Sequence, residues 1–155
     1  MNFDLKEDVA VPIDVLWGEV TDFSSFERSI LRRGADVERL DRNAEYGVGS
    51  AWDLSFSFRG KQRSARSEIE NFDGPNEFRV ESVSSGIEVS TVVELVALSR
   101  GRTRLSIAIE MSAKTLSSRL LLQSMKLARG TLTNRLKQRL ADFAKDVEER
   151  QQRNA

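Results

Sequence analysis

The chain has 155 residues, with 24 lysines and arginines against 24 aspartates and glutamates. This length suits one domain that buries roughly two-thirds of its unfolded surface, and the balanced charge gives no reason to expect a nucleic acid as the main partner. The absence of cysteine and histidine excludes disulfides, Cys/His zinc sites, thiol nucleophiles and histidine acid–base catalysis, and we expect neither a metal nor a cofactor.

The N-terminal segment alternates apolar and polar residues over 3–11, which predicts a first strand. It lacks the basic start and the apolar run of a signal peptide. No stretch of the chain has the ~20 apolar residues that are needed to span a bilayer. We therefore expect a cytoplasmic protein without stable membrane insertion.

Two short helices are predicted after this strand. Pro12 and Asp14 suit the first turn of a helix that ends near Asp22, and the apolar residues of 23–31 indicate a second helix. From 36 to 112 the apolar residues recur at every second position between glycine-containing turns. This pattern predicts an antiparallel meander of about six strands.

The turns of this meander predict which residues pair, because partners across a hairpin share one face of the sheet. Across a turn at Gly60-Lys61, the expected pairs are Trp52–Ile69, Leu54–Ser67 and Phe56–Ala65. Across a turn at Ser85-Gly86, they are Phe78–Val93, Val80–Thr91 and Ser82–Val89. Across a three-residue loop at 100–102, they are Leu95–Ile107, Val93–Ile109 and Thr91–Met111. In each hairpin the apolar side chains lie on the same side. That side is expected to be buried and the other to face water.

The inward face combines a large apolar surface with a few small polar groups, which is typical of a ligand pocket. It is expected to carry Trp52, Leu54, Phe56, Ile69, Phe78, Val80, Val93, Ile107 and Ile109, with Ser67, Ser82 and Thr91 as the polar exceptions. The same side chains could instead fill a closed core. Glu94 and Glu110 fall on the outward face, which argues against them as catalytic carboxylates.

After Ala113 the apolar residues are spaced by three or four, which predicts one long C-terminal helix. We expect its first half, through Leu121, Met125, Ala128 and Leu132, to close the pocket, and 136–147 to do ordinary packing. From Lys114 onward there are ten basic and four acidic residues. The expected organisation is one domain over 1–150 with a frayed tail at 151–155.

Short motifs occur in a recognisable order along the chain. They are Val9-Ala10-Val11-Pro12 with Val15 and Trp17, Asp22-Phe23, Gly47-Val48-Gly49, Phe72-Asp73-Gly74-Pro75, Gly101 with Thr103, and Ser118-Arg119-Leu120-Leu121-Leu122. With the order of elements they resemble the START-like (SRPBCC) superfamily of polyketide cyclases, lipid-transfer domains and birch-pollen allergens. The resemblance implies an α+β helix-grip fold, in which a curved sheet of about seven strands wraps a C-terminal helix around a cavity.

Few side chains are candidates for chemistry in such a cavity, since a cyclase needs a proton donor or acceptor near its substrate. Tyr46, the only tyrosine, could rim an entrance or cover an end of the sheet. Arg129 could bind a carboxylate or enolate in the pocket, or extend into solvent. Gly130, inside the expected helix, indicates a close approach of ligand or strand backbone, a tolerated surface glycine or a slight bend.

The leading hypothesis is the binding or carriage of a hydrophobic small molecule, lipid or polyketide-like. A polyketide cyclase or aromatase and a protein-interaction module are the alternatives. Transient contact with a membrane is possible through the basic residues around Gly60 and after the first helix, and the oligomeric state stays open. The expected ligand-binding residues are Trp52, Leu54, Phe56, Ser67, Ile69, Val80, Ser82, Thr91, Val93, Ile107, Leu121, Met125, Ala128, Arg129 and Leu132.

Overall fold

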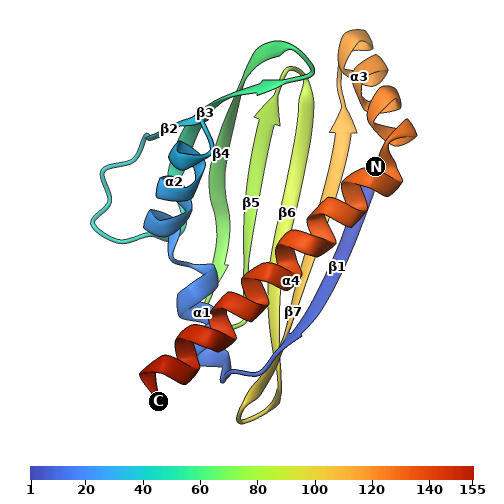
Figure 1. Ribbon diagram of the computed structural model, residues 1–155. Helices are drawn as coiled ribbons and strands as arrows, with labels where there is room; N and C mark the ends of the chain where they lie inside the picture. Colours follow the sequence, from blue (N-terminus) through green and yellow to red (C-terminus); the bar gives the residue numbers. More distant parts are fainter.

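A curved antiparallel sheet forms one layer of the molecule, and the helices cover its concave side (Figure 1). The computed structural model describes all residues from Met1 to Ala155, and it confirms the expected order of elements. These are β1 (Asn2–Val9), α1 (Ile13–Val20), α2 (Phe23–Arg32), β2 (Asp36–Arg39), β3 (Ala51–Phe58), β4 (Lys61–Asp73), β5 (Glu77–Ser84), β6 (Ile87–Ser99), β7 (Arg102–Ala113), α3 (Leu116–Leu127) and α4 (Arg129–Asn154).

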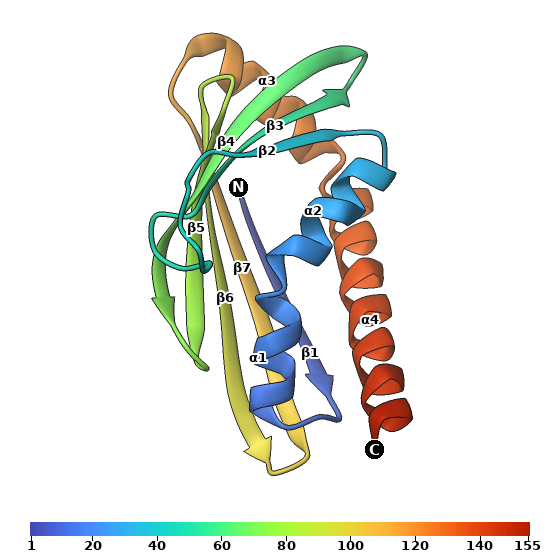
Figure 2. The same cartoon turned by 90° about the vertical axis from the view of Figure 1, so that its left-hand side faces the viewer.

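The sheet has seven strands in the order β1-β7-β6-β5-β4-β3-β2, so the meander of β2 to β7 is closed at one side by β1. Its β2–β4 side curls over toward α2 (Figure 2). The hairpin of β5 and β6 has the expected register, with Val80 opposite Thr91 and Phe78 opposite Val93. The sheet therefore forms the hollow against which α2 and α4 are placed.

The β3–β4 hairpin turns one residue earlier than expected. Its turn is Arg59-Gly60, both with positive φ (53° and 73°), as two-residue hairpin turns require. Trp52 consequently lies opposite Ser67 rather than Ile69, and Leu54 opposite Ala65. The pairing moves by two residues, so all these side chains keep the face predicted for them.

The β6–β7 hairpin also differs from the expected register. The turn is the two residues Arg100-Gly101, and the irregularity lies inside β6, between Ala97 and Ser99. Val93 is thereby opposite Ile107 rather than Ile109. This shift is again two residues, and the expected inward face is preserved because side chains alternate with a period of two.

The long helix expected at the C-terminus is two helices, α3 and α4, separated at Ala128 (φ −102°, ψ 15°). Gly130, beside this break, has open space where a side chain would be, so no close approach explains the glycine. Helix α4 continues through Asn154. The break matters for function, because α3 and α4 lie over different parts of the molecule (Figure 1).

The densest packing is at the end of the molecule where α1 and the last turns of α4 meet β1, β6 and β7. Val9, Val11, Leu16, Leu105 and Val147 are almost completely buried there. Only 22 of the 155 residues are buried in the whole chain, and several inward-facing side chains of the sheet keep part of their surface accessible. The concave face is therefore not filled by its own side chains.

Candidate ligand-binding pocket

A pocket of about 780 Å³ lies between the concave face of the sheet and the helices α2 and α4. This volume falls within the range of about 300–1,000 Å³ that is usual for small-molecule sites. Of the 29 residues that line it, 17 are hydrophobic, so apolar side chains dominate the wall. The sheet contributes Leu5, Val37, Trp52, Leu54, Ser67, Phe78, Val80, Val93, Leu105, Ile107 and Ile109.

The polar side chains of the pocket are not spread evenly. Apart from Ser67, they belong to the helices and the residues that cap them, namely Glu19, Asp22, Ser25, Glu27, Ser29, Arg32, Arg33, Arg139, Asp142, Asp146 and Arg150. The Ser67 hydroxyl is hydrogen-bonded to that of Ser82, with the two oxygens 2.7 Å apart. The pocket thus has an apolar floor on the sheet and a rim on the helices that carries nearly all of its polar groups beside further apolar side chains.

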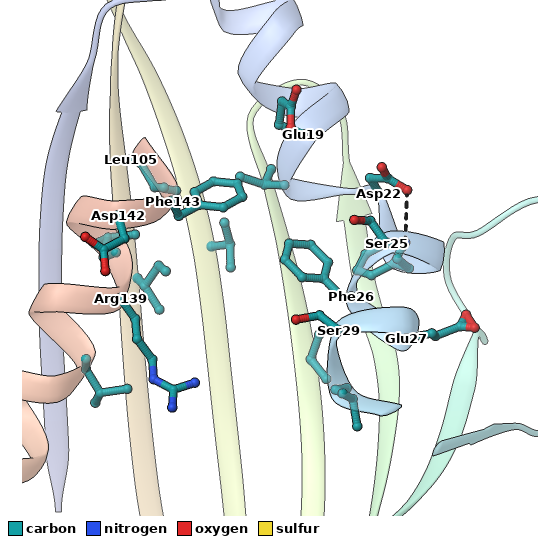
Figure 3. Close-up of a pocket in the computed structure, with 18 of the residues that line it drawn as sticks. Glu19, Asp22, Ser25, Phe26, Glu27, Ser29, Leu105, Arg139, Asp142 and Phe143 are labelled. Carbon is teal, nitrogen blue, oxygen red and sulfur yellow. Dashed lines mark hydrogen bonds between the residues drawn. The ribbon is translucent and has the colours of Figure 1, made fainter. Parts of the chain in front are cut away.

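The mouth of the pocket lies between α2 and α4. Phe26 and Ser29 of α2 point into the same space as Phe143 and Arg139 of α4 (Figure 3). The rings of Phe26 and Phe143 have centroids 6.2 Å apart and an interplanar angle of 33°. A molecule that enters between these helices therefore passes two aromatic rings before it meets the floor.

An ion pair joins α1 to the end of α4 at one side of the rim. Arg150 donates two hydrogen bonds to the Glu19 carboxylate, from Nε to Oε1 (3.2 Å) and from Nη2 to Oε2 (2.7 Å). These hydrogen bonds raise the pKa of the Arg150 guanidinium above its ordinary value. Because both side chains remain partly exposed, the pair fixes the spacing of the helices more than it adds stability.

The opposite lip, α2, is held from behind by Tyr46. The Tyr46 hydroxyl donates to Glu27 Oε1 (2.6 Å), its ring is stacked on Trp52 with centroids 6.1 Å apart, and the Arg39 guanidinium lies 4.1 Å from the ring centroid. Tyr46 does not line the pocket. It connects the loop before β3 to α2, so its place is behind the wall and not at the entrance.

The same loop is fixed at its base by Asp41. Its carboxylate accepts hydrogen bonds from Arg39 Nη2 (2.8 Å) and Nε (3.0 Å) and from the backbone N–H of Ala51 (3.1 Å). The hydrogen bonds from Arg39, with further ones from the backbone, lower the pKa of Asp41 to about 2. Arg39 thus joins Asp41 to Tyr46, and through Tyr46 to the lip of the pocket.

The structure brings together part of the ligand-binding set that we predicted from the sequence. The predicted residues that line the pocket are Trp52, Leu54, Ser67, Val80, Val93 and Ile107. Ile69 is buried in the core, and Arg129 lies on the surface, where it donates to the backbone oxygen of Asn2 (2.7 Å). The predicted residues outside the lining are Phe56, Ile69, Ser82, Thr91, Leu121, Met125, Ala128, Arg129 and Leu132.

The assignment of the two halves of the C-terminal helix was wrong. We expected Leu121 to Leu132 to close the pocket, but the helical wall is formed by Leu136, Leu140 and Phe143 of α4. The break at Ala128 is the reason, since α3 runs over the far end of the sheet. The contribution of α2, through Phe26 and Ile30, was also missed, although their spacing of four already marks a helical face.

Two further observations bear on the kinds of site that this chain contains. No group of three or more aspartate and glutamate side chains is placed to hold a metal ion. No helix combines the length and apolar character needed to cross a membrane.

No protein-family model matches the sequence, and no curated protein matches it. Solved structures, however, share its fold over nearly the whole chain. One is the Zhui aromatase/cyclase from Streptomyces sp. R1128, with 15% sequence identity, coverage of 97% of this chain and 94% of that chain, and a TM-score of 0.69. Another is the protein CV1439 from Chromobacterium violaceum, with 18% identity, coverage of 96% of this chain and 98% of that chain, and a TM-score of 0.64. A third is a norcoclaurine synthase point mutant from Thalictrum flavum, with 15% identity, coverage of 97% of this chain and 96% of that chain, and a TM-score of 0.69.

These structures are helix-grip proteins of the SRPBCC type, and the chain described here has the same fold. The resemblance of its motifs and element order to that superfamily is confirmed at the level of fold. At identities of 14–18% the likeness extends to the architecture and not to a particular activity.

Proposed function

We propose that this protein binds or carries a hydrophobic small molecule in the pocket between the concave sheet and α4. The observation that carries the proposal is the division of the pocket into an apolar floor and a polar rim. Each Å² of apolar ligand surface that leaves water on such a floor contributes about 25 cal/mol to binding. A helix-grip structure with helices packed directly on the sheet would have no such space.

The same division defines how a ligand would be oriented. Its apolar body would lie against Val80, Val93 and Ile107, and a polar group would stay near Ser29 and Arg139 at the mouth. Among proteins of this fold, the norcoclaurine synthase of Thalictrum flavum has been crystallised with dopamine and hydroxybenzaldehyde. Binding of small molecules that combine an apolar ring with polar groups is therefore compatible with this architecture.

The residues that we considered for a cyclase-like reaction do not favour that alternative. Tyr46 is behind the pocket wall and donates to Glu27, and Arg129 is on the surface over Phe3. Neither lines the pocket. The proposal is accordingly one of binding and carriage, without an assigned reaction.

A pocket-filling substitution tests the proposal with an uncharged fluorescent probe, N-phenyl-1-naphthylamine, whose emission rises on transfer to an apolar site. Val80 lines the pocket, whereas Val83 on the same strand is 52% exposed and outside it, so Val80→Trp and Val83→Trp form a matched pair. We expect Val80→Trp to weaken binding by about tenfold or more, a loss of 1.4 kcal/mol, and Val83→Trp to leave it unchanged.

Equal affinity of both variants, or no binding of the probe to the unsubstituted protein, would contradict a ligand pocket at this place. Circular dichroism and thermal unfolding of each variant show whether the fold is kept. If Val80→Trp does not fold, Leu136→Trp enters the same space from α4 and takes its place.

A further inference from the structure

Helix α3 presents three leucines to the outside of the molecule. Leu116, Leu120 and Leu127 are 75%, 64% and 92% exposed. At 3.6 residues per turn they fall within about 40° of one another around the helix axis, whereas the buried Ser118 and Leu122 lie on the opposite side. Single exposed leucines are ordinary on a protein surface, but a row of three on one helix face indicates an interaction site.

The packing of α3 keeps these leucines outward. The helix begins with reciprocal hydrogen bonds, in which Ser118 N donates to Thr115 Oγ1 (3.1 Å) and Thr115 N donates to Ser118 Oγ (2.9 Å). These two side chains fit against Gly86 of the β5–β6 turn, where a Cβ atom would lie 2.9 Å from Thr115 Oγ1. Farther along, Arg59 Nη1 donates to Ser124 Oγ (2.8 Å). The N-terminal cap and the contact with the β3–β4 hairpin together fix the rotation of α3 about its own axis.

The two charged side chains of α3 itself, Arg119 and Lys126, are both basic, and Lys114 just before the helix lies 3.7 Å from the Glu88 carboxylate of β6. Between Lys114 and Ala141 the chain has seven lysines and arginines and no aspartate or glutamate. Arg119 and Lys126 border the leucine row along the helix. The β3–β4 turn, with Arg59 and Lys61, lies at the same end of the molecule as α3 (Figures 1 and 2). The leucine row is therefore accompanied mainly by basic side chains, with Glu88 as the acidic one near the start of α3.

We propose that this leucine face of α3, defined by Leu116, Leu120 and Leu127, docks on the surface of an anionic lipid bilayer. The leucines would enter the boundary between headgroups and acyl chains, and the surrounding cations would lie at the level of the phosphates. Charge complementarity favours this occupant over a second copy of the chain, since two such faces would bring like charges together. The proposal concerns the outside of α3 and does not depend on the pocket.

Co-sedimentation with vesicles tests it, using phosphatidylcholine alone and phosphatidylcholine with about 30 mol% phosphatidylglycerol, which supplies the negative surface. We expect binding to the anionic vesicles only. The triple variant Leu116→Ser/Leu120→Ser/Leu127→Ser should lose at least about tenfold in partitioning, because membrane affinity scales with the apolar area inserted. Leu31→Ser on α2, where the leucine is 51% exposed and stands outside this face, is the matched control and should bind normally.

Separate variants test the contribution of the basic side chains to vesicle binding. Arg119→Gln and Lys126→Gln should each reduce partitioning by up to about fivefold, and added salt should weaken binding of the unsubstituted protein. Unchanged binding of the triple variant, equal binding to neutral vesicles, or no binding to either vesicle would overturn the proposal. A dimer in solution that depends on the three leucines, in a protein that does not bind vesicles, would overturn it as well and assign the face to self-association.

Discussion

Phe26 of α2 and Phe143 of α4 lie opposite each other across the mouth of the pocket, with ring centroids 6.2 Å apart. They belong to the same helices that carry most of the polar side chains of the pocket. Because they belong to separate helices, the width of the mouth depends on how firmly each helix is held. On the α1 side this is done by Glu19 and Arg150, and behind α2 by Tyr46.

The first prediction concerns passage through this mouth. Phe26→Ala should increase both the entry and the release rates of N-phenyl-1-naphthylamine by roughly threefold or more and change its affinity less, because the ring narrows the path and is 38% exposed. Stopped-flow fluorescence measures both rates. Leu31→Ala on the same helix is the control, since Leu31 does not line the pocket. Rates equal to those of the unsubstituted protein would show that the two rings do not limit passage.

The second prediction concerns the ion pair between α1 and α4. Glu19→Gln should lower the free energy of unfolding by about 0.5–1 kcal/mol at low salt, the usual contribution of a partly exposed pair with good geometry. Urea unfolding in low and high salt measures it, and the difference should shrink in high salt. The double variant Glu19→Gln/Arg150→Gln completes the cycle. If its effect equals the sum of the single effects, the two side chains are not coupled.

The third prediction concerns acid stability. The folded-state pKa of Asp41 is lowered to about 2 from an ordinary 3.8, so the stability that its carboxylate contributes is present above about pH 4 and is lost as pH falls through 2. Asp41→Asn should therefore cost roughly 1–3 kcal/mol at pH 7 and much less at pH 2. Urea unfolding at several pH values measures the difference, with Asp36→Asn, an exposed carboxylate on β2, as the control. A cost of Asp41→Asn that is the same at both pH values would contradict this assignment.

The fourth prediction concerns the attachment of α3 to the β5–β6 turn. Gly86→Ala and Gly60→Ala both place a side chain at positive φ (79° and 73°), but only at Gly86 does the new Cβ meet Thr115 and Ser118. We expect Gly86→Ala to be the more destabilising by about 1 kcal/mol or more, since Thr115 cannot move without breaking the cap of α3. Thermal unfolding compares the two variants. Equal losses of thermal stability in the two variants would show that the capping contacts of α3 adjust to the new Cβ without a cost in free energy.

Much of the fold follows from local patterns in the sequence. The alternation along the strands placed Leu54, Val80, Val93 and Ile107 on the concave face, and the structure confirms these positions. Both register errors, at Arg59-Gly60 and Arg100-Gly101, were shifts of two residues. Side chains alternate with the same period, so the faces were insensitive to such errors while the cross-strand partners were not.

The position of the pocket was decided only by the tertiary structure. The spacing of leucines continues through Ala128, so nothing local distinguishes one bent helix from the two helices α3 and α4. A periodic apolar face shows that a helix has a buried side, but not which surface covers it. Here Leu140 lines the pocket from α4, whereas Leu120 and Leu127 of α3 remain in solvent. By itself the sequence determined the order of the elements and the faces of the strands, because these depend on neighbours along the chain. The direction of α4 and the mouth beside α2 depend on contacts between distant segments, and only the folded molecule contains those.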